Sequence, residues 1–191
     1  MISSFCLTYF WFVCIRILYK LLYKTFYSYF YFDFWGVQKL FSQIDGVVST
    51  ACGYVNGRED IVPSYERVCM GDSEYRECVR VEYDPSKVSL EKLLRVFFFV
   101  IDPSQEDGQG HDVGDQYRTG IYFIRDEDRV VIKEFVDSIR SSYYSFYTEV
   151  LLLKNFYRAE EFHQDYLVKH PNGYCHIPLA KYEDVKRLLE D

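Results

Sequence analysis

The sequence predicts one mixed α/β or α+β domain of 191 residues. Helix-like and strand-like segments alternate loosely along the chain, two long polar loops interrupt them, and no internal repeat or linker divides them. With 49% hydrophobic residues, a chain of this length can bury one good core. A single domain is therefore expected.

The first helix is predicted directly after residues 31–36, which read Tyr-Phe-Asp-Phe-Trp-Gly. Apolar residues follow at helical spacing: Val37, Leu40, Phe41 and Ile44. The helix is expected to end near Asp45-Gly46, because glycine is a common C-terminal stop. A strand is then predicted over residues 47–55, broken at Gly53, and Asn56-Gly57 predicts a turn.

Residues 58–76 are polar and predict an irregular loop. Residues 77–83 alternate cleanly and predict a strand. One face of it carries Val79, Val81 and Tyr83, and the other carries Cys78, Arg80 and Glu82.

Ser89 can cap a second helix, which an Asp-Pro pair stops at residues 102–103. A second long loop spans residues 104–119. The remaining predicted elements are a strand over 120–124, a helix from Asp126 with Val131, Phe135, Val136 and Ile139 facing inward, a strand over 148–153, a short helix within 159–168 and an amphipathic turn over 182–189.

Residues 1–32 differ in composition from the rest of the chain, being rich in aromatic residues and free of acidic ones. The uncharged run to Ile15 is shorter than the roughly 20 residues that span a bilayer, and the positive charges follow it, unlike those of a secretory signal. Arg16, Lys20 and Lys24 form a stripe that would suit an interfacial anchor. A poorly ordered extension, or a wrongly chosen start or reading frame, is favoured over membrane contact.

The six cysteines, at positions 6, 14, 52, 69, 78 and 175, include no C-x-x-C pair and no cluster with zinc spacing. The sequence therefore predicts no metal site and no bound cofactor. Free thiols in a reducing compartment, the cytoplasm, are expected. The net charge of −7 argues against a nucleic-acid partner, because the chain offers no basic face to phosphates.

Residues that could do chemistry lie at the first helix start and on the two long loops. A helix N-terminus presents free N–H groups and the positive end of the dipole, which suits an anionic reacting group. Tyr65 lies in the first loop, Glu77 opens the strand after it, and Asp112 and Tyr117 lie in the second loop. A carboxyl buried by aromatics would have a raised pKa and could donate a proton. For any one of these residues alone, a solvated acid or a tyrosine bonded to backbone is the commoner role.

Three further residues leave their roles open. Cys175 follows Asn-Gly-Tyr in a glycine-containing tail, from which a thiol can swing toward another site. His163 has no visible partner and is expected to be a packed or surface histidine. His111 is a weak candidate for the same reason.

Eight segments in order resemble the peptide-methionine (S)-S-oxide reductases, the A-type methionine sulfoxide reductases. The resemblance runs from Phe34 to about Ile177 and includes Gly-His-Asp-Val-Gly-Asp-Gln-Tyr-Arg at 110–118 and Asn-Gly-Tyr-Cys-His-Ile at 172–177. The segments cover residues 34–37, 45–50, 53–57, 63–69, 81–85, 110–118, 156–164 and 172–177. The resemblance implies a single α+β domain over residues 33–191, a mixed β-sheet flanked by helices in a two-layer sandwich with a ferredoxin-like core, and a divergent extension over residues 1–32.

The family resemblance also implies an activity, the reduction of methionine-(S)-sulfoxide, free or in peptides and proteins, as repair after oxidation. A cysteine at the helix N-terminus attacks the sulfur, an acid protonates the oxygen, and the sulfenic acid is resolved into a disulfide that thioredoxin or another dithiol reduces. By position, Glu77 resembles the proton donor and Cys175 the resolving thiol. The substrate-binding residues by resemblance are Phe34 and Trp35 for the methyl group, and Tyr65, Asp112 and Tyr117 for the oxygen or a water.

The chain departs from the family's Gly-Cys-Phe-Trp-Gly corner, because Phe32 stands for the first glycine and Asp33 for the nucleophilic cysteine. The apolar strand that precedes this corner in the family is not recognisable. An aspartate oxygen cannot pass through a sulfenic acid and disulfide, so the chain as written is expected to be inactive.

Three hypotheses follow. The chain is a reductase by descent with a peculiarity of sequence or frame at and before position 33, or an inactive variant that binds the sulfoxide or a partner. In the third and least favoured hypothesis, Asp33 and Glu77 form a hydrolytic carboxylate pair.

Overall fold

One mixed six-stranded sheet positions the elements of the molecule. The computed structural model describes residues 26–31 and 34–190. The strand order is β7-β6-β1-β3-β2-β8, and neighbours pair antiparallel except β6 with β7, which are parallel. The strands are β1 Phe26–Tyr31, β2 Val47–Val55, β3 Arg76–Tyr83, β6 Gly120–Phe123, β7 Glu149–Leu152 and β8 Phe156–Arg158. A separate two-stranded hairpin joins β4 Gly108–Gln109 to β5 Asp112–Val113.

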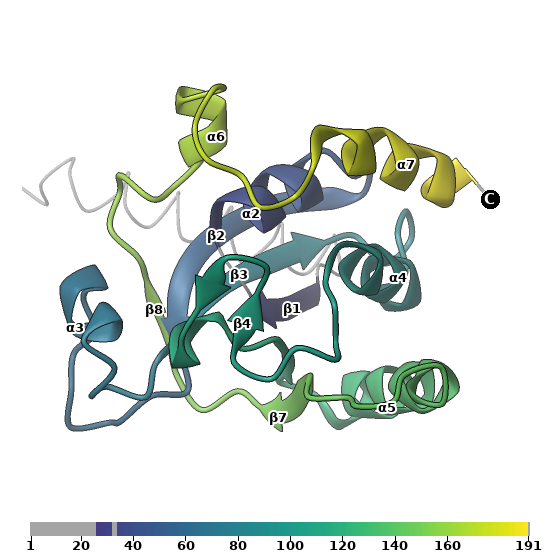
Figure 1. The fold of residues 1–191 in the computed structure, drawn as a ribbon. Coiled ribbons are helices and arrows are strands. Elements are labelled where there is room, and N and C mark those ends of the chain that lie inside the picture. The colour runs from purple at the N-terminus through teal and green to yellow at the C-terminus, as the bar shows by residue number, and fades with distance from the viewer. Residues whose placement is uncertain (1–25, 32–33, 191) are drawn as a thin grey trace, which may run out of the picture.

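The helices alternate with the strands along the chain, which can be followed by the colour of the ribbon from purple to yellow (Figure 1). They are α2 Phe34–Ser42, α3 Tyr65–Cys69, α4 Leu90–Val100, the 3₁₀ turn η1 Asp115–Tyr117, α5 Asp126–Arg140, α6 Tyr166–Lys169 and α7 Leu179–Glu190. Apolar residues of α2, α4, α5 and α7 join one core with residues of β1, β3 and β6. The arrangement confirms the predicted α+β class, a mixed sheet with helices packed on it.

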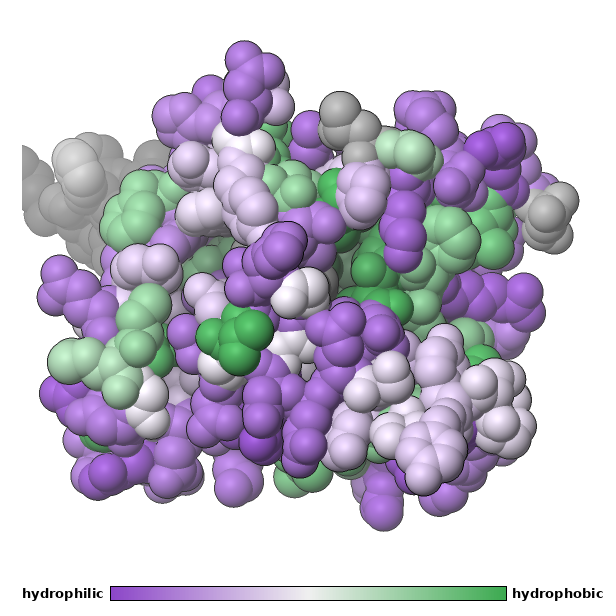
Figure 2. Space-filling view, viewed as in Figure 1, coloured by the Kyte–Doolittle hydropathy of each residue, from purple (hydrophilic) through white to green (hydrophobic). Residues whose placement is uncertain are grey.

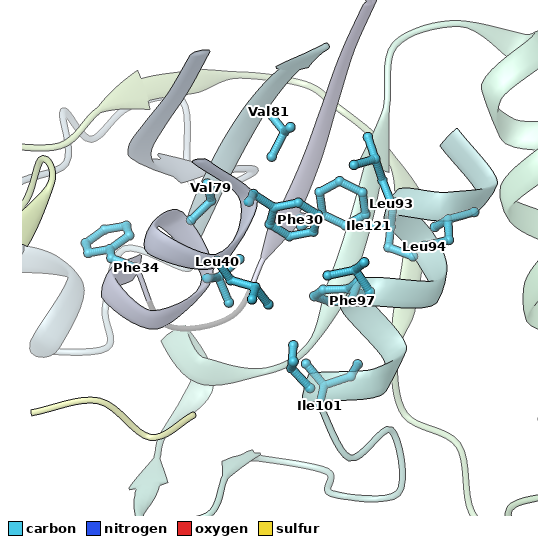
Figure 3. Packing of buried hydrophobic residues seen from close by; sticks show 14 of the residues in the cluster. Phe30, Phe34, Leu40, Val79, Val81, Leu93, Leu94, Phe97, Ile101 and Ile121 are labelled. Atoms are coloured by element: carbon cyan, nitrogen blue, oxygen red, sulfur yellow. The ribbon is translucent and has the colours of Figure 1, made fainter. Parts of the chain in front are cut away.

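Phe30 lies at the middle of this core, between the helices and the sheet (Figure 3). Its ring stacks on Phe41 of α2 at 4.7 Å and meets Phe97 of α4 at 5.2 Å. The opposite face of the sheet buries a smaller cluster, formed by Tyr29, Val55, Cys78 and Tyr122. The sheet is therefore covered unequally, with the larger core on the helix side.

Residues 26–31 were placed by their composition in the N-terminal extension, but the structure makes them β1, between β3 and β6. Six residue pairs join β1 to β3, from Phe26 opposite Tyr83 to Tyr31 opposite Cys78. The strand that could not be recognised in the sequence before the corner is therefore present. A strand buried on both faces lacks the polar–apolar alternation by which strands are recognised. Residues 1–25, including the proposed basic stripe, lie outside the described part of the chain.

The alternation predicted for residues 77–83 is confirmed, since Val79, Val81 and Tyr83 join the larger core while Cys78 joins the smaller one. Ser89 caps α4 as expected, accepting a hydrogen bond from the Lys92 N–H at 3.2 Å. The cap satisfies one of the unpaired N–H groups at the helix start.

Three local predictions are wrong. β2 continues through Gly53, where a Cβ would lie 2.3 Å from the Phe156 ring, so the glycine admits the edge strand β8 instead of breaking β2. In α5, Ile132 is buried while Val131 is 37% exposed, so Val131 does not face inward. The loop over residues 58–76 contains the short helix α3, whose cap is the Ser64 side chain.

Candidate functional site

A cavity of about 130 Å³ lies at the N-terminus of α2. Its size approaches the roughly 150 Å³ that accepts a benzene-sized ligand in a protein interior. Its lining brings together seven of the residues considered in the sequence analysis and adds Tyr174; the eight are Phe34, Trp35, Tyr65, Glu77, Asp112, Tyr117, His163 and Tyr174. Helices α2 and α3, strands β3 and β5, the 3₁₀ turn η1 and two loop segments thus converge on one small pocket.

Each lining side chain is placed by a local feature of the chain. Phe34 and Trp35 form the first turn of α2, and Tyr65 is the first residue of α3. Glu77 is the second residue of β3 and shares its inward face with the core valines, which is why a carboxyl is buried there to 3% exposure. Asp112 comes from the small hairpin and Tyr117 from the 3₁₀ turn that follows it.

One side of the pocket is aromatic. The Trp35 ring stacks on Tyr166 of α6 with centroids 4.0 Å apart, and its indole N–H donates to His163 Nδ1 at 3.3 Å. The His163 ring also lies 5.0 Å from Phe34 and 4.8 Å from Tyr65. His163 is buried, so it is the packed histidine that the sequence predicted, and it holds the indole in one orientation.

A buried network supports this wall from behind. Because Trp35 donates to Nδ1, a neutral His163 carries its hydrogen on Nε2, which faces a Glu160 oxygen at 3.9 Å. Glu160 also accepts from the Tyr54 hydroxyl and the Tyr65 N–H, each at 2.8 Å. Burial opposes ionisation of Glu160, but these hydrogen bonds and the nearby His163 outweigh it and hold its pKa below the usual value.

The remaining lining of the pocket is polar. Burial, reinforced by the charge of Glu77, holds the pKa of the Tyr117 phenol well above its usual value, so this hydroxyl remains a hydrogen-bond donor at neutral pH. The Tyr174 hydroxyl, from the C-terminal tail, donates to Asp112 Oδ2 at 3.3 Å. Glu77 is 3% exposed and lines the same cavity, so its carboxyl is placed to give a proton to an oxygen atom bound there.

The cysteines of the described residues differ sharply in environment. Cys52 and Cys78 are completely buried, and burial raises the pKa of the Cys78 thiol well above normal, which makes it unreactive. Cys69 is exposed at the end of α3, and burial of its sulfur raises the pKa despite a hydrogen bond with Tyr65. Cys175 is half-buried in the tail after Tyr174. Asp33 lies outside the described residues.

The sequence did not single out three residues that build the site: Glu160, Tyr166 and Tyr174. A usable signal was present for Glu160, since an acid and a histidine three residues apart stand in a segment that otherwise follows the family pattern. His111 is exposed and does not line the pocket. Among the residues that the structure describes, no group of histidine, cysteine and acidic side chains could hold a metal ion.

Residues 33–189 match the family model of peptide methionine sulfoxide reductase. The chain belongs to this family. It is 51% identical over 146 residues to the peptide methionine sulfoxide reductase MsrA of Clostridium acetobutylicum, covering 76% of this chain and 90% of that protein.

Solved structures agree. The reduced form of Mxr1 from Saccharomyces cerevisiae superposes with a TM-score of 0.75 at 34% identity, over 79% of this chain and 88% of Mxr1. Mxr1 in complex with Trx2 superposes with a TM-score of 0.53 at 23% identity, over 74% of this chain and 84% of that one, which speaks for the fold alone. The family assignment therefore rests on both sequence and fold.

Proposed function

We propose that the pocket at the start of α2 binds methionine-(S)-sulfoxide, free or within a protein, and that this fold reduces it to methionine when a thiol stands at position 33. The pocket itself carries the proposal, because an aromatic wall faces a buried carboxyl and two phenols across a cavity of about 130 Å³. The proposed domain comprises the matched residues 33–189 together with β1.

The two faces of the pocket suit the two ends of a sulfoxide group. Phe34 and Trp35 would contact its methyl group, since aromatic rings offer apolar area with fixed orientation. Tyr65, Asp112 and Tyr117 would hold its oxygen or a water beside it. The raised pKa of the Tyr117 phenol supports this role, because a protonated hydroxyl can donate to the sulfoxide oxygen.

Glu77 would supply the proton that the oxygen needs as it leaves the substrate sulfur. In the proposed reaction a thiolate attacks that sulfur and the oxygen passes to the attacking sulfur as a sulfenic acid. The substrate gains two electrons and becomes methionine. Cys175 would then displace the hydroxyl as water and form a disulfide, which thioredoxin or another dithiol reduces. Yeast Mxr1 has been solved in complex with Trx2. A reducing compartment such as the cytoplasm would supply a dithiol of this kind.

Asp33 would occupy the nucleophile's position, because it directly precedes Phe34, the first residue of α2. A carboxylate there can neither accept the oxygen nor form a disulfide. We therefore expect the chain as written to bind the sulfoxide without consuming thiol, and no bound cofactor is needed for either step.

The test compares the chain as written with Asp33→Cys in reduction of a methionine-(S)-sulfoxide peptide by dithiothreitol, with Asp33→Ser as the matched control. Methionine formation is expected from Asp33→Cys alone. Activity of the chain as written would contradict the role given to Asp33 and point to another cysteine. If folded Asp33→Cys formed no methionine, the proposed reduction would be contradicted. Binding of the sulfoxide or of a partner, measured by quenching of tryptophan fluorescence, would then be the function.

A further inference from the structure

The C-terminal tail lies directly on the first turn of α2. It crosses α2 between α6 and α7 (Figure 1). A Cβ placed on Gly36 would lie 3.1 Å from Cys175 Sγ, 3.0 Å from the His176 ring and 3.2 Å from Ile177. The glycine leaves room for the tail, and the Cys175 sulfur therefore rests against Gly36, the third residue of α2.

One tyrosine of α7 joins the thiol to the helix. The Tyr182 hydroxyl donates to the Gly36 carbonyl oxygen at 3.1 Å and lies 3.5 Å from Cys175 Sγ. The thiol also donates to the Ile177 carbonyl at 3.3 Å, and the Tyr182 side chain is 6% exposed. A single buried hydroxyl thus contacts both the tail's sulfur and the helix on which the tail rests.

Helix α7 is itself held in place, which makes Tyr182 a fixed point. Near its start, Lys181 Nζ donates to the Phe99 carbonyl at the end of α4 at 2.8 Å. Near its end, the Leu189 carbonyl accepts from Lys92 Nζ of α4 at 3.0 Å, and Val185 between them is buried. The tail before Cys175 is attached elsewhere, since the Tyr174 hydroxyl donates to Asp112, and the Cys175 sulfur itself is held on α2 by the contacts at Gly36 and Tyr182.

We infer that Tyr182 is a positioning residue that holds the Cys175 thiol at the start of α2, where it can resolve a sulfenic acid at position 33. The inference rests on the proposed function. In the resolving step the Cys175 sulfur bonds to the sulfenic sulfur, the S–O bond breaks, and water leaves with the hydroxyl and the thiol proton. The sulfenic sulfur already carries the two-electron oxidation that it gained from the sulfoxide, so its condensation with one thiol gives the disulfide and requires no further oxidant.

Tyr182→Phe tests the inference in the Asp33→Cys chain, because it removes only the hydroxyl and keeps the buried ring. The first equivalent of methionine is expected to form at an unchanged rate. Disulfide formation, measured by acid quenching and mass analysis, is expected to slow by about tenfold, which corresponds to the free energy of one hydrogen bond. The matched control is Tyr144→Phe, whose side chain is fully exposed. Equal disulfide rates in the two variants, or an equal slowing of the first turnover, would overturn the positioning role.

The chain as written provides a test that does not depend on catalysis. Cys175 is expected to react several-fold faster with a bulky maleimide in Tyr182→Phe than in the unmodified chain, because the tail leaves Gly36 more often. The exposed Cys69 serves as the internal reference. If Asp33→Cys forms no methionine, the proposed function fails, and this labelling rate still decides whether Tyr182 holds the tail. Unchanged labelling of Cys175 would overturn the inference.

Discussion

The two faces of the central sheet place adjacent residues of one strand in different environments. On β3, Glu77 points to the helix-covered face and lines the pocket, while Cys78 points to the opposite face and is sealed in the smaller cluster. Both are buried and titratable. The difference is that Glu77 lies against a cavity at a helix N-terminus, whereas Cys78 is completely buried in a cluster with Tyr29, Val55 and Tyr122. Burial produces a functional group only where a ligand can reach it.

The described surface of the molecule offers few other candidates for a functional site. The face seen in Figure 2 is mainly hydrophilic, with apolar side chains scattered over it. Among the described residues, no helix is long and apolar enough to cross a membrane. Within that part of the chain, the features that point to chemistry gather at the pocket.

The largest effect is expected from the β3 pair. In the Asp33→Cys chain, Glu77→Gln removes the acidic proton but keeps the shape, so turnover of the sulfoxide peptide should fall about 10²–10⁴-fold, the range for one general acid. Cys78→Ala should leave turnover unchanged, because its thiol faces away from the pocket. Thermal unfolding of both variants verifies that they are folded. A large loss of turnover from Cys78→Ala, or none from Glu77→Gln, would contradict the division between faces.

The next effect concerns stability and compares adjacent residues of β1. Phe30→Ala should lower the free energy of unfolding by about 3–5 kcal/mol, since it opens a cavity between Phe41 and Phe97 in the middle of the larger core. Tyr29→Ala removes a ring from the smaller cluster, at a side chain that is 6% exposed against 0% for Phe30, and should cost less, roughly 2 kcal/mol. Urea unfolding measures both, and a greater loss from Tyr29→Ala would reverse the ranking of the two cores.

The same division explains which parts of the fold the sequence predicted. One face of β3 packs in the larger core and the other in the smaller cluster. Because Arg80 and Glu82 lie on the second face, apolar and polar residues alternate visibly along the strand. α4 carries an apolar stripe and a serine cap, and was predicted for the same reason. β1 has aromatic residues on both faces, and its role follows only from pairing with β3 and β6, which are distant in sequence.

The site divides in a similar way. Phe34, Trp35 and the polar candidates were indicated by residue type and by the family pattern, but nothing local shows that the loops bearing Tyr65 and Tyr117 meet. The role of Glu160 was not predicted, because it depends on the groups that donate to its carboxylate, from Tyr54 and Tyr65, which are far away along the chain. Interactions between distant segments decide such roles, and short-range patterns do not contain them.

The smallest effect compares two adjacent acids after β8. Hydrogen bonds hold the pKa of Glu160 below its usual 4.5 against the opposing effect of burial. A hydrogen bond and ion pair with Arg158 lower the pKa of the fully exposed Glu161. A lowered folded-state pKa contributes stability that is present above about pH 4.5 and is lost as pH falls through the folded value.

Glu160→Gln should therefore flatten the loss of stability below pH 4.5 and cost about 1 kcal/mol at pH 7. This cost should persist in 1 M salt, because the groups that donate to Glu160, the Tyr54 hydroxyl and the Tyr65 N–H, are partly buried. Any effect of Glu161→Gln should vanish there, since salt screens the surface pair. Urea unfolding at both salt concentrations across pH 3–7 measures the difference. If 1 M salt also removed the loss of stability caused by Glu160→Gln, the Glu160 carboxylate would behave as a surface charge. Its contribution to the aromatic wall would then come from packing alone.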